Sequence, residues 1–269
     1  MLTLKSLTVS SFDIDSLTLT WEFKSTTELI TDYTIDVYRS ESPTEVTTVS
    51  GVKANYDHIA SGLSAENYSY KDTSIENIYD PFRQWYYRLL FTKEDQPNKQ
   101  FLLGDSKPAY VNDNSLDKAY KEILRRKTLV LNKKTGRDCK VLKRRTFGTY
   151  CTTCYDEVLF RATDPDCTEC HGTGFKTGYF PAISMKAMIN AAPKYNQITM
   201  FGEFMPSDAL LNTLNFPPLR PRDVIVDNIN RRYLVRQVRP IEKNGVLIEQ
   251  AVQISLISPD DYVYQLPLT

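Results

Sequence analysis

The chain has 269 residues, and its 33 lysines and arginines are balanced by 33 aspartates and glutamates. Hydrophobic residues make up 41% of it, which is enough to bury a core and excludes a wholly disordered chain. There is no run of roughly eighteen apolar residues, and the N-terminus lacks the basic and then apolar layout of a signal peptide. We therefore expect a soluble protein that is not exported. The length favours two domains.

The charges are distributed unevenly along the chain. Residues 1–117 carry ten basic and 18 acidic residues, residues 118–145 carry 12 and two, and residues 146–269 carry 11 and 13. The middle segment therefore holds the whole positive excess, a net charge of +10 (12 against two). Such a block is typical of a solvated helix face or of a segment that binds nucleic acid or an acidic protein surface.

Alternation of apolar and polar residues predicts strands at residues 17–23, 33–39 and 85–91. Clusters of Ser, Asp, Asn and Pro separate these segments, and no helical period is visible before residue 115. The expected fold of residues 1–114 is therefore an all-β sandwich.

This region resembles a fibronectin type III domain over roughly residues 3–112. Trp85 stands where that family usually places a tyrosine whose hydroxyl ties down a corner of the fold. The resemblance implies a recognition or spacer module without catalysis. The residues that carry it are Trp21, Tyr33-x-Ile35-x-Val37, Tyr70–Ser74 and Tyr87-Arg88-Leu89-x-Phe91.

Residues 115–148 are predicted to be a short basic helical connector. Ser115 is a plausible N-cap, and apolar residues at three- to four-residue spacing predict a helix over residues 115–127. Thr128–Leu131 and Asp138–Leu142 are then expected to be short strands or extended chain. The basic residues of this connector have two possible roles. They are either solvated and structural, or they contact DNA phosphates, without reading the bases, or an acidic subunit. The candidate contact residues are Lys121, Arg125, Arg126, Lys133, Lys134, Arg144 and Arg145.

The sharpest chemical signal is a pair of C-x2-C motifs within residues 149–178. Each motif lets two thiolates converge from one tight turn, so that both together can complete a tetrahedral shell of four sulfurs. A full shell leaves no open position, so the spacing predicts a structural zinc knuckle (Zn2+), with rubredoxin-like iron or a bare thiol cluster as alternatives. Cys139 lies outside the pattern as a free, partly buried thiol, and His171 is a substitute ligand. The predicted ligands are Cys151, Cys154, Cys167 and Cys170.

The second motif continues as Cys170-His-Gly-Thr-Gly174, which is similar to the zinc repeats of J-domain co-chaperones. The string occurs once in full, because the first motif lacks the glycines. We therefore infer a pair of zinc knuckles and not a chaperone. Its expected task is to staple a segment with too few apolar residues to fold alone.

Residues 179–269 are predicted to form an antiparallel β-barrel or meander with a long loop over residues 190–222. Strands are expected at 223–227, 233–238 and 251–257, joined by tight turns at 227–231 and at Asn244–Gly245. A loop of this length inside a domain is usually functional or ordered by a partner.

The string Leu219-Arg-Pro-Arg-Asp-Val-Ile-Val-Asp227, a tight turn and Arg232–Val238 together resemble the core of tailed-phage head-to-tail connector proteins, the head-closure or stopper group. The resemblance spans roughly residues 179–260. In that family a small β-barrel presents a long loop, subunits form a ring below the portal, and the loops help to gate the DNA channel. The sandwich and the knuckle lie outside what we expect of a minimal member.

The resemblance implies a virion structural protein of the phage neck, assembled in the host cytoplasm. Its partners would be itself, in a homo-oligomeric ring of six or twelve subunits, and portal or adaptor and tail proteins. Non-specific contact with packaged DNA is expected, and membrane contact is not. The alternatives are a collar, baseplate or tail component, and a zinc-containing nucleic-acid-binding protein.

An enzyme is the least favoured class. The sequence has no Gly-rich phosphate loop, nucleophile elbow or H-E-x-x-H motif, and His58 and His171 are its two histidines. No pair of carboxylates stands out from the acidic background. We therefore predict no catalytic residues, and a metal-dependent enzyme is kept only as a third hypothesis.

Overall fold

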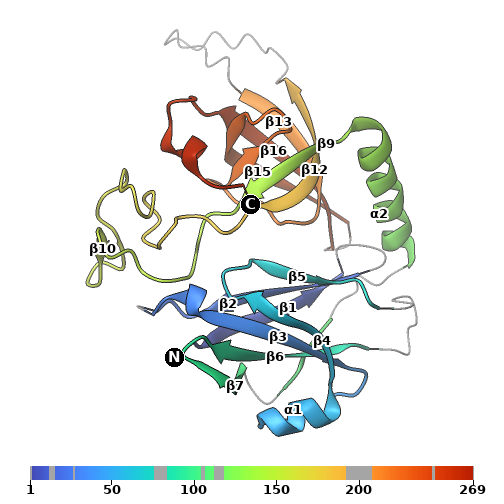
Figure 1. Ribbon diagram of the computed structural model, residues 1–269. Coiled ribbons are helices and arrows are strands. Elements are labelled where there is room, and N and C mark those ends of the chain that lie inside the picture. Colours follow the sequence, from blue (N-terminus) through green and yellow to red (C-terminus); the bar gives the residue numbers. More distant parts are fainter. Residues whose placement is uncertain are drawn as a thin grey trace. The chain divides into compact units, whose positions relative to one another are not determined.

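A computed structural model of the protein is mainly β (Figure 1). The chain divides into two units, of which unit 1 contains residues 1–121 and 145–180, and unit 2 contains residues 122–144 and 181–269. This division differs from the predicted one, because the cysteine segment groups with the N-terminal sheets. Among the described residues, no helix is both long and apolar enough to cross a membrane. The structure describes residues 2–11, 16–26, 28–75, 84–103, 107–111, 118–191, 208–243 and 246–268.

The N-terminal part of unit 1, up to residue 121, contains two antiparallel sheets. The first has the order β1 (Leu4–Ser10), β2 (Leu17–Phe23), β5 (Ser69–Asp72). The second has the order β4 (Asp57–Ser64), β3 (Tyr33–Ser40), β6 (Tyr86–Lys93), β7 (Gln96–Leu103), and β8 (Ala109–Tyr110) also pairs with β6. The alternating pattern predicted β2, β3 and β6 correctly. Leu19, Ile35 and Leu89 on these strands are fully buried, and both sheets contribute to one core.

Two short helical elements interrupt the strands, η1 (Ile30–Asp32) and α1 (Val49–Asn55). The Thr48 hydroxyl caps α1 by accepting the Gly51 N–H at 3.1 Å. The expectation of no helix before residue 115 is wrong here. A helix of seven residues that buries only Val52 is too short to show a period.

Tyr87 on β6 connects the two sheets of unit 1. Its hydroxyl donates to the buried carboxylate of Asp72 on β5 at 2.8 Å, and Arg39 donates to the same carboxylate at 2.8 Å. Burial, together with the charge of Asp72, raises the pKa of Tyr87 and keeps the hydroxyl a donor. Trp85 instead lies under the Arg39 guanidinium, 4.6 Å from its ring centroid. Tyr87, and not Trp85, therefore bonds the second sheet to β5 of the first.

Unit 2 is a closed antiparallel barrel with the strand order β12-β13-β16-β15-β14-β9, as predicted for the fold class. Val141 on β9 is paired with Ile183 on one side and Ile225 on the other, which closes the barrel. The interior is aliphatic, and Leu211, Val252 and other core side chains are fully buried. The strands are β9 (Arg137–Leu142), β12 (Ile183–Ala191), β13 (Asp208–Leu214), β14 (Val224–Val226), β15 (Arg232–Lys243) and β16 (Val246–Leu256).

Two barrel strands lie where the sequence predicted no part of the barrel wall. β9 confirms the extended chain expected at Asp138–Leu142, but it belongs to the barrel and not to a separate connector, and its charged residues alternate with the buried Cys139 and Val141. β13 occupies part of the predicted loop 190–222 and buries Leu211 and Thr213. Residues 192–207 of that loop and the predicted Asn244–Gly245 turn lie outside the described residues.

The basic helix α2 (Lys118–Val130) continues into one π-helical turn, η3 (Leu131–Thr135), which ends where the Gly136 N–H donates to the Leu131 carbonyl at 2.8 Å. The expected extended chain at residues 128–131 is therefore helical. The predicted N-cap Ser115 lies outside the described residues. A 3-10 turn, η4 (Tyr262–Gln265), precedes the C-terminus.

Candidate metal centre

The cysteine segment, residues 149–178, has little regular structure. Its only strands are β10 (Tyr155–Asp156) and β11 (Arg161–Ala162), which pair as a small hairpin. Tyr150 stacks on Tyr155 with ring centroids 4.1 Å apart. The four cysteines form a buried cluster of their own within this segment.

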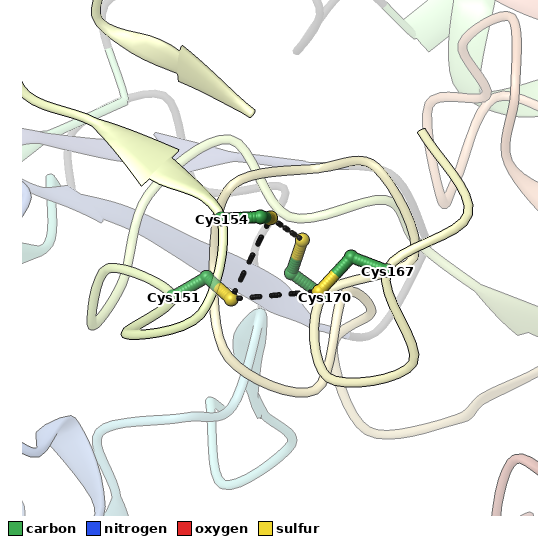
Figure 2. A group of neighbouring side chains, drawn as sticks. All are labelled: Cys151, Cys154, Cys167 and Cys170. Atoms are coloured by element: carbon green, nitrogen blue, oxygen red, sulfur yellow. Dashed lines mark hydrogen bonds between the residues drawn. The ribbon is translucent and has the colours of Figure 1, made fainter. Parts of the chain in front are cut away.

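Figure 2 shows the four cysteine side chains converging from two tight turns. All four Sγ atoms lie within 4.8 Å of one another. The Sγ atom of Cys151 is 3.8 Å from that of Cys167 and 3.8 Å from that of Cys154. Four sulfurs about 2.3 Å from a tetrahedral Zn2+ ion lie about 3.8 Å apart, so the donor set is compatible with such an ion, with the Sγ atoms of Cys154 and Cys170 closer together at 3.2 Å. The predicted grouping of Cys151, Cys154, Cys167 and Cys170 is confirmed, and the identity of the metal is a proposal.

Left-handed backbone conformations shape the second turn. His171 and Gly172 have φ angles of +51° and +70°. A Cβ atom on Gly172 would lie 2.6 Å from the Pro165 carbonyl oxygen, so this position requires glycine. The Gly174 carbonyl accepts the N–H of Cys151 at 2.9 Å and thereby joins the two cysteine turns. The glycines after Cys170 therefore give the second turn its geometry.

Burial and local hydrogen bonds affect the four thiols differently. Burial raises the pKa of Cys151 to about 11 and also raises the pKa of Cys154. Burial acts in the same direction on Cys167, but the backbone N–H groups of Cys170 and Glu169 outweigh it and lower that pKa to about 7. Four thiolates this close repel one another, so a cation is needed to hold all of them deprotonated.

Glu169 lies directly beside the cluster. Its carboxylate accepts from the Thr153 hydroxyl at 2.7 Å and from the Cys151 thiol at 3.1 Å. These hydrogen bonds hold the pKa of Glu169 below its usual value. The Lys176 ammonium is 3.8 Å from the same carboxylate.

The two other candidate metal or thiol residues do not join the cluster. Among the described residues, the group that could hold an ion consists of the four cysteines without His171. The His171 ring lies against Tyr179, with ring centroids 6.4 Å apart. Cys139 lies on β9 of the barrel, and its thiol is free and buried. Burial raises its pKa to about 11.

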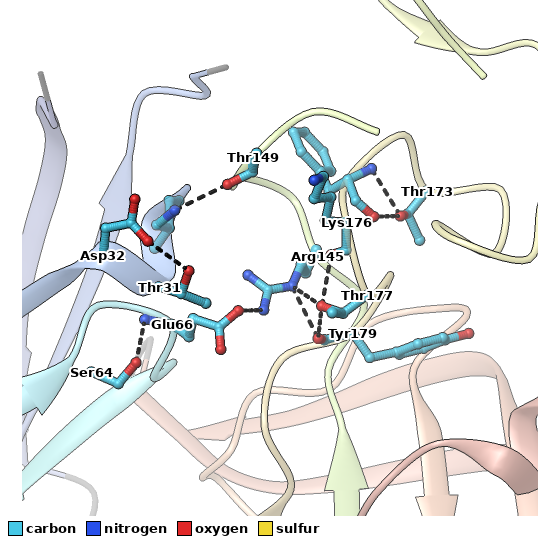
Figure 3. A network of polar contacts seen from close by, with 12 residues as sticks. Thr31, Asp32, Ser64, Glu66, Arg145, Thr149, Thr173, Lys176, Thr177 and Tyr179 are labelled. Atoms are coloured by element: carbon cyan, nitrogen blue, oxygen red, sulfur yellow. Dashed lines mark hydrogen bonds and ion pairs between the residues drawn. The ribbon is translucent and has the colours of Figure 1, made fainter. Parts of the chain in front are cut away.

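Arg145 was predicted as a surface contact, which is wrong because only 5% of the residue is exposed. Figure 3 shows its guanidinium between Glu66 and the end of the cysteine segment. It donates to Glu66 at 2.6 Å and to the Tyr179 carbonyl at 3.0 Å. At the other end of the segment, the Thr149 hydroxyl accepts the Ile30 N–H at 3.0 Å. Both ends of the cysteine segment are therefore bonded to the N-terminal sheets of unit 1.

The other predicted contact residues do not form one group. Arg125 and Arg126 donate to Glu122 at 2.9 and 2.7 Å. Lys133 and Lys134 are exposed on η3. Arg144 is half-buried, with its backbone N–H bonded to Asp223, and the side chain of Lys121 lies outside the described part of the chain.

Two features were not singled out in the sequence. Lys143 is buried and forms an ion pair with Asp223, which is 80 residues away, so no local pattern could reveal it. Val158, Leu159 and Phe160 are consecutive apolar residues at the tip of the β10–β11 hairpin, and they are exposed. An apolar triplet in a polar segment was a visible signal for them.

No protein-family model matches the chain, and no curated protein matches it. Four sulfur donors are enough to fill a tetrahedral shell, and closed metal sites of that kind are typically structural.

Proposed function

We propose that this protein is a structural component of a tailed-phage virion, a ring-forming connector of the neck between portal and tail. The observation that carries the proposal is the place of the phage-like string in the fold. Its two halves, Leu219–Asp227 and Arg232–Val238, surround the β14–β15 turn of a closed antiparallel barrel. In the connector family that the string resembles, a small barrel forms the wall of the ring.

The string's acidic residues have local structural roles that support this reading. Asp223 accepts the backbone N–H groups of Arg220 at 2.8 Å and Arg144 at 2.9 Å. Asp227 accepts the Arg231 N–H at 2.8 Å and closes the β14–β15 turn. The string therefore encodes a particular entry into the β14–β15 hairpin.

We infer that the cysteine cluster holds a structural Zn2+ ion and that the N-terminal sheets are a fibronectin type III-like module. The orders β1-β2-β5 and β4-β3-β6-β7 agree with a two-sheet sandwich of that type. Both would be additions to a connector barrel, serving as a spacer or a recognition module.

Electron microscopy of the purified full chain, alone and mixed with portal and tail preparations from the same source, tests the proposal. We expect ring particles of six or twelve subunits that attach to the portal. A chain that stays monomeric and joins neither preparation would contradict it. Labelling of the protein in whole virions separates a neck from a baseplate or collar position.

A zinc-containing nucleic-acid-binding protein is the second candidate, because Arg126, Lys133 and Lys134 are exposed. It predicts a gel shift that weakens steeply with salt and disappears when these three residues are neutralised. Binding that survives the substitutions would contradict this candidate.

A further inference from the structure

The tip of the β10–β11 hairpin is the most exposed apolar feature of the described residues. Val158 is 84% exposed, Leu159 54% and Phe160 78%. Exposure of three neighbouring apolar side chains to water is unfavourable in free energy, and binding to a partner surface would bury them. The tip is therefore a candidate binding surface.

The tip is held in a fixed shape. The Asp156 carboxylate accepts the N–H groups of Val158 at 2.8 Å and Leu159 at 3.0 Å. Phe160 has a φ angle of +50°, a conformation that bulky residues rarely adopt. The base of the hairpin is adjacent to Cys154 in the sequence and so to the cysteine cluster. A preorganised apolar tip loses little conformational entropy on binding.

The charges around the tip restrict its partner. Residues 156–166 contain four carboxylates, Asp156, Glu157, Asp164 and Asp166, against the single Arg161. An acidic surround repels phosphate-rich surfaces such as anionic lipid and nucleic acid. It favours an apolar pocket whose rim is basic.

The chain itself carries a surface of that kind. In unit 2, a cavity of about 310 Å³ between α2–η3 and the barrel strands is lined by Val130, Leu131, Met188 and Leu214. Val130 is 51% exposed at its edge. Glu249 and Lys127 also line the cavity and pair with each other at 2.9 Å. Around them, residues 125–134 carry four further basic residues, of which Arg125 and Arg126 pair with Glu122, and Lys133 and Lys134 are exposed on η3.

We propose that the hairpin tip Val158–Phe160 of one copy docks in the cavity beside α2–η3 of a second copy. The apolar side chains of the tip would contact the apolar lining of the cavity, and the acidic residues around the tip would face the basic residues of α2 and η3. Tip and cavity are different surfaces, so the contact is head-to-tail, and contacts of this type close into rings or continue as filaments. For its biological role the inference rests on the proposed ring-forming function.

Sedimentation velocity of the full chain over a range of concentrations tests the contact. We expect wild-type protein to self-associate, more weakly at high salt, and Phe160→Asp to raise the dissociation constant by about 30-fold or more. Aspartate tolerates positive φ better than phenylalanine, so this variant keeps the hairpin. Ile229→Asp is the matched control, because Ile229 is 63% exposed at the β14–β15 turn and should associate like wild type.

A mixing experiment gives the sharper result. Val130→Asp disables the cavity and keeps the tip, whereas Phe160→Asp disables the tip and keeps the cavity. Each variant alone should be monomeric, and an equal mixture should form a one-to-one dimer that cannot grow further. A mixture that stays monomeric, or a wild-type chain that never associates, would overturn the inference.

The outcomes separate this inference from the proposed function. Rings that form and bind portal equally well with Phe160→Asp would overturn the docking contact and leave the connector proposal intact. A tip-dependent dimer of the mixed variants from a protein that never joins portal or tail would support the contact and contradict the connector.

Discussion

The cysteine segment and the barrel bury different kinds of side chain. Within residues 149–178 the buried cluster consists of four cysteines, and the hairpin β10–β11 pairs only two residues on each strand. The barrel has an aliphatic interior and a ladder that closes on itself. Stability is therefore concentrated in a few atoms in the segment and distributed over many residues in the barrel. A single substitution in the cysteine segment should therefore unfold that segment as a whole, whereas a single substitution in the barrel should remove only part of the barrel's unfolding free energy.

The largest effect is expected when the sulfur shell is broken. Cys167→Ser removes one of the four sulfur ligands and should abolish stoichiometric metal binding. The effect on folding should be large, because binding of structural zinc contributes about 10–16 kcal/mol to the folding of small domains of this kind. Hydrogen exchange should show residues 149–178 losing protection while the barrel strands keep theirs. Metal analysis of the purified variant gives the second readout, against about one equivalent in wild type.

Cys139→Ser is the control, because Cys139 is buried in the barrel and not in the cluster. It should retain the metal and lose only about 1–3 kcal/mol of unfolding free energy. Protection that disappears from the barrel and the segment together in Cys167→Ser would show that the two regions are not independent.

In the barrel, the largest single effect should come from Asp223. Asp223→Ala leaves the Lys143 ammonium buried without its counter-charge and should cost about 3–5 kcal/mol of unfolding free energy in chemical denaturation. Asp138→Ala is the matched control. Asp138 pairs with Lys186 but its side chain is 83% exposed, so about 0–1 kcal/mol is expected.

The deficit in Asp223→Ala should depend on pH with a definite sign. Burial already lowers the pKa of Lys143 from its ordinary 10.5, and removal of Asp223 lowers it further. The folded variant then binds fewer protons than the unfolded chain, so its stability rises as the pH approaches 10.5. A deficit that is constant between pH 7 and 10 would contradict this account.

Glycine substitutions compare a constrained position with an open one. Gly62 and Gly172 both have positive φ angles, but a Cβ atom on Gly62 meets nothing within 4 Å. Gly62→Ala should cost about 1 kcal/mol from backbone strain alone. Gly172→Ala adds the clash with Pro165 and should weaken metal binding about tenfold or more in a chelator competition. Equal effects of both substitutions on metal affinity would contradict the assigned role of Gly172.

The smallest effect is expected from the charge beside the cluster. Glu169→Gln removes a negative charge next to Cys151 and should tighten metal binding about two- to fivefold. Lys176→Gln removes the nearby positive charge and should weaken binding to a similar extent. Affinities that move together in the two variants would show that hydrogen bonding, and not charge, controls the site.

The sequence was informative where a pattern is local. The alternation in Leu17–Phe23 predicted strand β2, and the spacing of the four cysteines predicted their cluster, because each pattern depends on residues within one strand or turn. β13 was missed, and β9 was predicted only as an extended stretch of the connector, since charged or irregular stretches become barrel strands only when barrel neighbours pair with them. Arg145 was misassigned because its partner Glu66 lies 79 residues away. A charge count cannot separate exposed cations from those paired inside a core.

The position of β9 has a consequence for biosynthesis. The ribosome makes this strand before the cysteine segment, yet its partners β12 and β14 come after it. Unit 1 is complete in sequence at Phe180, while β9 must wait unpaired until the rest of the barrel emerges. A fragment that starts at Pro181 would leave β12 and β14 with open edges, which invite pairing between chains and aggregation. The gene therefore cannot be divided by one cut into two fragments that both fold.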